Sequence, residues 1–176
     1  MQHTNPSDIY LRGLCYAFEH MLKKGNTAPL DVVVYDQNDK KASLKDCLGS
    51  WVVLYFYPKD DTPGCTTQAK GFRDHIGDFQ KQDAIVIGVS KDTAKKHQKF
   101  INKYDLNFQL WVDEDHRLME AFGTWGEKKF MGKTYMGTTR STFLINPEGN
   151  IVNVWEKVKP AGHAEEVLQN LVDLSA

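Results

Sequence analysis

The sequence predicts an α/β fold in which a mixed central sheet is flanked by helices. Two continuous apolar runs of strand length, residues 51–57 and 84–89, are typical of central strands that are covered on both faces. A segment with helical spacing of its apolar residues follows each run, and a hairpin signal lies near the end of the chain. Because strands and helices alternate in this way, we expect helices to pack on the faces of one sheet.

An extra amphipathic helix is expected before this domain, over residues 8–24. Ser7 or Asp8 is a suitable N-cap, and Gly25 is a suitable stop. The apolar positions lie on one helical face, and they are Leu11, Leu14, Cys15, Phe18, Met21 and Leu22. This face must cover the domain, a second subunit or a partner. We therefore divide the chain into an N-terminal extension, residues 1–20, and a domain, residues 21–176.

The first half of the domain contains both predicted central strands. A strand over 32–35 precedes the polar turn 36–39, and the apolar run 51–57 follows. A helix is expected to begin at Cys65, because apolar residues recur at helical spacing after it. These residues are Ala69, Phe72, Ile76 and Phe79. The run 84–89 is then the second buried strand.

The second half continues the alternation of strands and helices. The expected elements are a helix over 93–104, a strand over 108–112, a helix over 117–122, strands over 141–145 and 151–158, and a helix over 163–174. The last two strands flank Asn146-Pro147-Glu148-Gly149-Asn150, a strong hairpin signal. The closing helix turns one apolar face inward, made of Ala164, Val167, Leu168 and Leu171.

Composition and charge exclude several classes of function. With 22 basic and 23 acidic residues the net charge is −1, which gives nucleic-acid binding no electrostatic support. The apolar runs are strand-sized, and Arg12 and Glu19 interrupt the N-terminal stretch, so we expect neither a membrane span nor a cleavable signal. Three widely spaced cysteines do not make a disulfide framework, and they suit a reducing compartment. We expect a cytoplasmic protein.

Cys65 is the most informative residue of the chain. It follows the apolar run 51–57 and a polar loop, and it stands where a helix is expected to begin. The first turn of a helix offers N–H groups without intrahelical partners and the positive end of the helix dipole. Both favour thiolate over thiol, and the thiolate is the nucleophile. The context therefore indicates a reactive thiol rather than a structural one.

Four further residues can complete a site around this sulfur. Thr62 lies three residues before it and offers a hydroxyl, while Pro58 has a rigid ring that can form an apolar wall. The N–H groups of Gly64 and Cys65 can point into the same pocket, and glycine tolerates unusual backbone angles. Arg140, beside the start of the strand 141–145, is the best candidate for a permanent cation.

The run Pro58-Lys59-Asp60-Asp61-Thr62-Pro63-Gly64-Cys65-Thr66-Thr67-Gln68-Ala69 resembles the active-site signature of peroxiredoxins, in the subfamily called bacterioferritin comigratory protein or peroxiredoxin Q. Segments 123–129 with 137–145, and then 162–168, are similar to further segments of that subfamily in the same order. The resemblance covers roughly residues 21 to 174.

This resemblance implies a thioredoxin-like fold and thiol-dependent reduction of hydrogen peroxide and organic hydroperoxides. By likeness, Cys65 is the peroxidatic residue and Thr62 binds the peroxide. Pro58 shields the sulfur, and Arg140 orients the substrate and stabilises the thiolate. The family usually uses thioredoxin as reductant, so we expect thioredoxin or another thiol as partner. We expect no metal or organic cofactor, and a monomer or weak homodimer.

The chain departs from the family in its resolving cysteine. Many members carry a second cysteine five residues after the first, where this chain has Lys70, and the helix 93–104 contains none either. Cys47 and Cys65 lie before and after a seven-residue strand, which separates them by roughly 23 Å at about 3.3 Å per residue. Cys47 is therefore a poor resolving partner, whereas a resolving role for Cys15 stays open.

Two other classes of function are alternatives to a peroxidase. A redox sensor or binding module of the same fold would use Cys65 as a switch, and steady peroxide turnover distinguishes an enzyme from it. A disulfide oxidoreductase usually needs two close cysteines, and no C-x-x-C motif is present. The histidines lack metal-ligand spacing and are interpreted as structural or exposed; they include His75, His97, His116 and His163.

Overall fold

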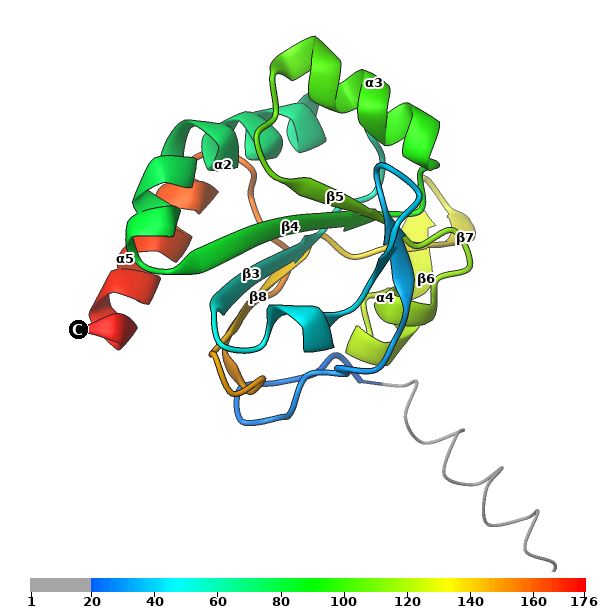
Figure 1. Cartoon of the computed structure of the whole chain (residues 1–176). Helices are drawn as coiled ribbons and strands as arrows, with labels where there is room; N and C mark the ends of the chain where they lie inside the picture. The colour runs from blue at the N-terminus through cyan, green and yellow to red at the C-terminus, as the bar shows by residue number, and fades with distance from the viewer. Residues whose placement is uncertain (1–19) are drawn as a thin grey trace, which may run out of the picture.

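A seven-stranded mixed sheet forms the centre of the molecule in the computed structural model, which describes residues 20–176 (Figure 1). The strand order is β2-β1-β5-β4-β3-β8-β9. The bounds are β1 Val34–Asp36, β2 Lys41–Ala42, β3 Trp51–Phe56, β4 Ala84–Ser90, β5 Gln109–Val112, β8 Ser141–Ile145 and β9 Ile151–Trp155. β3, β4 and β5 are parallel, whereas β8 runs antiparallel to β3 and β1 runs antiparallel to β5. The predicted mixed sheet is confirmed.

Helices cover both faces of this sheet. Their bounds are η1 Leu44–Cys47 (a 3₁₀-helix), α2 Pro63–Lys81, α3 Ala94–Tyr104, α4 Arg117–Phe122 and α5 His163–Ser175. Side chains of α2, α3 and α5 share one apolar cluster with Val53 and Tyr55 of β3, and α4 packs in the opposite cluster with Val52 and Leu54. Successive side chains of a strand point to opposite faces, so one continuous apolar strand supplies both clusters.

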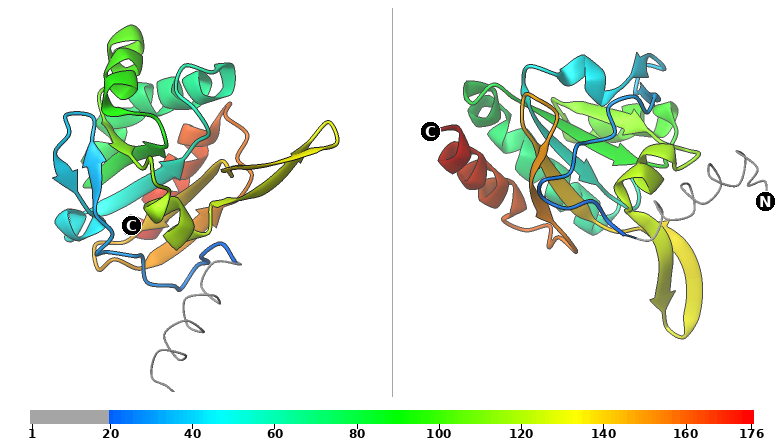
Figure 2. Two further views of the ribbon diagram at one scale, coloured as in Figure 1. Left: turned by 90° about the vertical axis from the view of Figure 1, so that its right-hand side faces the viewer. Right: turned by 90° about the horizontal axis from the view of Figure 1, so that it is seen from below.

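The hairpin of β6, Trp125–Phe130, and β7, Lys133–Thr138, was not predicted. Figure 2 shows it extending away from the central sheet. Most of its residues are exposed, and Met131 at its turn is 86% exposed. Because the hairpin buries little apolar surface on either face, its sequence lacks the alternation of polar and apolar residues by which a strand is predicted.

The segment that enters the domain is also different from the prediction. Residues 8–19 of the predicted helix lie outside the described residues, but residues 20–24 form a bend and a turn rather than a helix. The N–H of Leu22 donates to the carbonyl of Phe122 at 3.0 Å. A Cβ on Gly123 would lie 2.6 Å from Cα of Met21, so this glycine lets the two backbones pass closely. The helix prediction is wrong for residues 20–24, because this tertiary contact ties the backbone at Leu22 to the end of α4.

Among residues 20–176, no helix has the length and apolar character that crossing a membrane requires.

Candidate active site

Cys65 lies in the first turn of α2, at the carboxyl end of β3. The helix begins two residues earlier than predicted, at Pro63, because proline suits the first helical position, where its missing N–H costs no hydrogen bond. Thr62 is the N-cap, and its carbonyl accepts the N–H of Thr66 at 2.9 Å. Cys65 is only 1% exposed, since it also belongs to the apolar cluster under α2 and α5. The thiol is therefore buried at a helix N-terminus.

Arg140 meets this sulfur from a distant part of the chain. Its Nη2 donates to Sγ of Cys65 at 3.3 Å. Sheet pairing explains the contact: β8 is antiparallel to β3 with Ser141 opposite Phe56, so the residue before β8 lies beside the point where β3 ends. The structure thus brings the predicted cation to the predicted nucleophile.

Gln68 is a site residue that sequence reasoning missed. Its Oε1 accepts from Nη1 of Arg140 at 2.7 Å, and the side chain is 1% exposed. Gln68 lies three residues after Cys65 on the same helix, a spacing that places two side chains on one face and could have predicted the pairing. Its Nε2 has no hydrogen-bond partner among the described residues. The guanidinium is therefore held between Gln68 and Cys65, and one amide donor remains available.

Tyr55 of β3 places a second unpaired polar atom in this part of the core. The side chain is fully buried, and its hydroxyl has no partner among the described residues. Burial, and then the charge of Cys65, hold the pKa of Tyr55 well above its ordinary value, so the hydroxyl keeps its proton as a donor. Gly88 makes room for this ring, since a Cβ there would lie 2.8 Å from Cζ of Tyr55.

Gly64 matters for its lack of a side chain rather than for unusual backbone angles. Its φ is not positive, in contrast to the expectation that it would supply a special conformation. A Cβ on Gly64 would lie 3.1 Å from Nη2 of Arg140 and 3.4 Å from Cγ of Pro160. Glycine therefore leaves space for the guanidinium and for the loop before α5. The left-handed residue of this segment is Asp61, with φ 57°.

Thr62 and Pro58 stand on the loop between β3 and α2. The hydroxyl of Thr62 donates to the carbonyl of Lys59 at 3.0 Å, so its proton is engaged while its lone pairs remain open to a donor. Pro58 directly follows Tyr57 and is exposed. The roles predicted for these two residues stay predictions.

Cys47 lies far from the site. It ends η1 and packs with the cluster on the face of the sheet opposite to Cys65. Burial, helped by the charge of Asp46, raises the pKa of Cys47 to about 11, so this thiol is a poor nucleophile at neutral pH. Cys15 lies outside the described residues.

The arrangement suits nucleophilic attack by the sulfur on a small electrophile. The sulfur is held by a permanent cation, and the donors nearby are fixed by the fold before any substrate arrives. Within residues 20–176, no three His, Cys, Asp or Glu side chains are grouped as a metal site would require.

Comparison with known proteins gives consistent matches over most of the chain. The model of the AhpC/TSA family matches residues 25–154. The chain is 50% identical over 151 residues to peroxiredoxin Bcp of Bacillus subtilis, covering 86% of this chain and 96% of the relative. It is 46% identical over 147 residues to peroxiredoxin Bcp of Escherichia coli, covering 84% and 94%.

A solved structure of the Xanthomonas campestris bacterioferritin comigratory protein, studied for its alkyl peroxide reduction activity, is similar with a TM-score of 0.82 and 39% identity. It covers 89% of this chain and 100% of that one. The thioredoxin-like fold implied by the resemblance is confirmed.

Proposed function

Because this chain belongs to the peroxiredoxins of the AhpC/TSA family, which are thiol peroxidases, we propose that Cys65 reduces hydrogen peroxide and organic hydroperoxides through a sulfenic acid. The observation that carries the proposal is the 3.3 Å contact between Nη2 of Arg140 and Sγ of Cys65. The alkyl peroxide reduction studied in the Xanthomonas campestris relative supports organic hydroperoxides as substrates.

In the proposed reaction the Cys65 thiolate attacks one peroxide oxygen, and the O–O bond breaks. The sulfur loses two electrons and becomes a sulfenic acid, while the other oxygen leaves as alkoxide or hydroxide and takes up a proton to give an alcohol or water. Negative charge moves from sulfur to the leaving oxygen during this step. A guanidinium that is fixed in place and can donate to both the sulfur and the leaving oxygen stabilises this charge. It therefore lowers the barrier without rearrangement.

Thr62 is proposed to hold the attacked peroxide by accepting a hydrogen bond from its O–H group. Its own hydroxyl proton already points to the carbonyl of Lys59, so its lone pairs are what it offers to a substrate O–H. The free Nε2 of Gln68 is a further donor for the peroxide oxygens. Pro58 is proposed to shield the sulfur from solvent, as the family resemblance implies.

A one-cysteine cycle is proposed for the return of the enzyme to the thiol. Lys70 replaces the usual resolving cysteine, and its ammonium lies 5.0 Å from the ring centre of Tyr104. Cys47 packs on the face of the sheet opposite to Cys65, so it is not placed to resolve the sulfenic acid. An external thiol, thioredoxin or another reductant, would attack the sulfenic sulfur and release water, and a second thiol would then reduce the mixed disulfide.

The direct test compares peroxide consumption by the wild type and by Cys65→Ser, with thioredoxin, glutathione and dithiothreitol as reductants. Cys65→Ser should lose the activity, because a hydroxyl is a far weaker nucleophile at neutral pH. Cys47→Ser is the control and should keep the first oxidation step. Activity of Cys65→Ser near that of the wild type would refute the assignment.

Arg140→Met tests the cation by removing its charge and both of its hydrogen bonds. The rate constant with peroxide should fall, and ultraviolet absorbance should show less thiolate at neutral pH. If neither the rate constant nor the thiolate absorbance changes, Arg140 does not act in the site.

Intact-mass spectrometry tests the one-cysteine cycle after one equivalent of peroxide without reductant. An added oxygen or a dimer is expected. A quantitative loss of two hydrogens in the monomer would refute the cycle, and peptide mapping would then ask whether Cys15 resolves Cys65. The cytoplasmic location, a monomeric or weakly dimeric state, and the division at residue 20 stay predictions.

A further inference from the structure

The β6–β7 hairpin has no role in the proposed function, yet it carries a cluster of exposed apolar side chains. Nine large apolar residues are exposed among residues 20–176, and four of them belong to this hairpin. They are Phe130, Met131, Tyr135 and Met136, and each is at least half exposed. Apolar residues scattered singly over a surface need no explanation, whereas a cluster marks an interaction site. The hairpin is therefore a candidate binding surface.

The turn of the hairpin is an unusual place for an apolar residue. Met131 and Gly132 both have positive φ, 47° and 76°, as a tight two-residue hairpin turn requires. Asparagine, aspartate or glycine usually occupies the first of these positions, because other side chains are strained there. Met131 gains no packing in return, since it is 86% exposed. A use outside the folded chain explains this methionine better than stability does.

Apolar side chains lie on both faces of this two-stranded ribbon. Phe130 and Tyr135 share one face, because Phe130 is opposite Lys133, two residues before Tyr135 in β7. Met136 directly follows Tyr135, so it lies on the other face. A protein partner would cover one face of such a ribbon, whereas the interior of a lipid bilayer surrounds an inserted tip on all sides.

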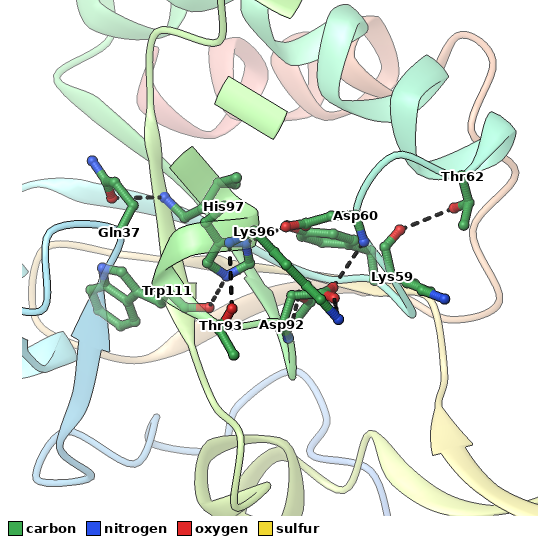
Figure 3. Close-up of polar contacts among 12 residues, drawn as sticks. Gln37, Lys59, Asp60, Thr62, Asp92, Thr93, Lys96, His97 and Trp111 are labelled. Atoms are coloured by element: carbon green, nitrogen blue, oxygen red, sulfur yellow. Dashed lines mark hydrogen bonds and ion pairs between the residues drawn. The ribbon is translucent and has the colours of Figure 1, made fainter. Parts of the chain in front are cut away.

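The hairpin also carries a surplus of positive charge. It contains three lysines, Lys128, Lys129 and Lys133, against one glutamate, which gives a net charge of +2. None of these lysines forms an ion pair with another residue that the structure describes. By contrast, Nζ of Lys96 on α3 lies 3.6 Å from Oδ1 of Asp92 (Figure 3). The ammonium groups of the hairpin are therefore available to an external negative charge.

The order of side chains along the hairpin suits the surface of an anionic bilayer. The apolar tip, Phe130 and Met131, can enter the boundary of the acyl chains while the three lysines contact anionic head groups. The strand from Met131 to Lys128 spans roughly 10 Å, which is the depth that interfacial segments reach. Tyr135 is of a residue type that is enriched at membrane–water interfaces. Figure 2 shows the hairpin projecting from the domain, so the tip can be inserted while the domain stays in water.

We propose that the β6–β7 hairpin docks this protein on anionic lipid bilayers, with the apolar tip inserted and the three lysines on the head groups. Such a contact lies on the membrane and needs no spanning helix. It goes beyond the proposed function, because the thiol takes no part in it. β7 ends two residues before Arg140, so a docked hairpin holds the candidate active site within roughly 25 Å of the lipid surface.

Vesicle flotation with the whole chain tests the docking. Vesicles made of equal parts of phosphatidylcholine and phosphatidylglycerol should carry the wild type at low ionic strength, and vesicles of phosphatidylcholine alone should carry much less. Binding should weaken as salt is added, because salt screens the charge of the lysines. A wild type that does not float with the anionic vesicles would overturn the proposal.

Lys129→Gln combined with Lys133→Gln tests the charge of the hairpin. The apparent dissociation constant for anionic vesicles should rise about tenfold or more, because each lysine near an anionic surface adds to binding. Lys95→Gln combined with Lys99→Gln on α3 is the matched control. It removes the same charge from two exposed lysines that have no ion pair among the described residues, and it should bind as the wild type does. Equal losses in the two double variants would refute docking by the hairpin.

Phe130→Ser combined with Met131→Ser tests insertion of the tip. Binding should weaken about tenfold or more at unchanged net charge, because binding scales with the apolar area that is buried. Phe130→Trp should show more quenching of tryptophan fluorescence by brominated phosphatidylcholine, mixed with phosphatidylglycerol, than the wild type. Unchanged binding of the serine variant, or no added quenching, would contradict insertion.

Two further results separate this proposal from its alternatives. A wild-type dimer that binds no vesicles and dissociates in the serine variant would overturn the proposal and assign the tip to a second copy of the chain. Cys65→Ser should bind vesicles as tightly as the wild type, because the thiol takes no part in docking. An active Cys65→Ser would refute the proposed function alone, whereas an active wild type that binds no vesicles would refute the docking alone.

Discussion

Gly64→Ala should make this protein more stable and a slower peroxidase, because one added methyl group acts with opposite sign on the helix and on the site. Gly64 is the second residue of α2 and its φ is not positive, so alanine suits the backbone there. Replacing a helical glycine by alanine stabilises by roughly 0.5–1 kcal/mol.

The cost to the site follows from the distances around the new methyl group. Its Cβ would lie 3.1 Å from Nη2 of Arg140, which must move by a few tenths of an ångström. The same guanidinium lies 3.3 Å from Sγ of Cys65 and 2.7 Å from Oε1 of Gln68. A hydrogen bond to a charged group contributes about 1.5–3 kcal/mol, and its complete loss would slow the reaction about 10- to 150-fold. Because displacement is partial, we expect a decrease of about tenfold.

The assay combines thermal unfolding with the stopped-flow rate constant for hydrogen peroxide. Gly77→Ala is the matched control: it lies on the same helix, and a Cβ there meets nothing within 4 Å. It should gain similar stability and keep the wild-type rate constant. If Gly64→Ala reacts with peroxide as fast as Gly77→Ala, the missing side chain of Gly64 is not needed to position the guanidinium of Arg140, and the prediction is wrong.

Three more predictions concern single groups. Gln68→Leu removes the oxygen that holds Nη1 of Arg140 at 2.7 Å, and it should slow peroxide reduction by up to about tenfold, less than Arg140→Met; equal effects would contradict this ranking. Burial raises the pKa of Cys47 to about 11, so iodoacetamide near neutral pH should label it slowly in the folded protein and rapidly in urea, as peptide mass spectrometry can measure. Burial lowers the pKa of His163 from 6.5 to about 4, so the unfolded chain binds this proton more tightly than the folded one. The free energy of unfolding from urea titrations should therefore fall as pH drops from 6.5 to 4, by at most about 3 kcal/mol, and His163→Asn should show a smaller fall.

Local sequence patterns were enough for much of the fold and for the nucleophile. The continuous apolar runs around Val53 and Val86 predicted the central strands, because each buries both faces of one sheet. The spacing of apolar residues after Cys65 predicted α2, and with it a thiol at a helix N-terminus. Arg140 was predicted from its residue type and from its place before a strand. These features depend on neighbours in the chain, which the sequence shows directly.

Tertiary structure decided which distant groups meet. The 3.3 Å contact of Arg140 with Cys65 joins residues 75 positions apart, and it depends on the register of β8 against β3. The sequence predicts His97 only as a structural or exposed histidine, and its bond to Asp60, 37 positions away, follows from the packing of α3 on β5. The carbonyl of Trp111 that completes this pair is a backbone atom, which no residue type reveals. The chemistry of each side chain can therefore be predicted from the sequence, whereas the partners that orient the side chain are set by sheet register and helix packing.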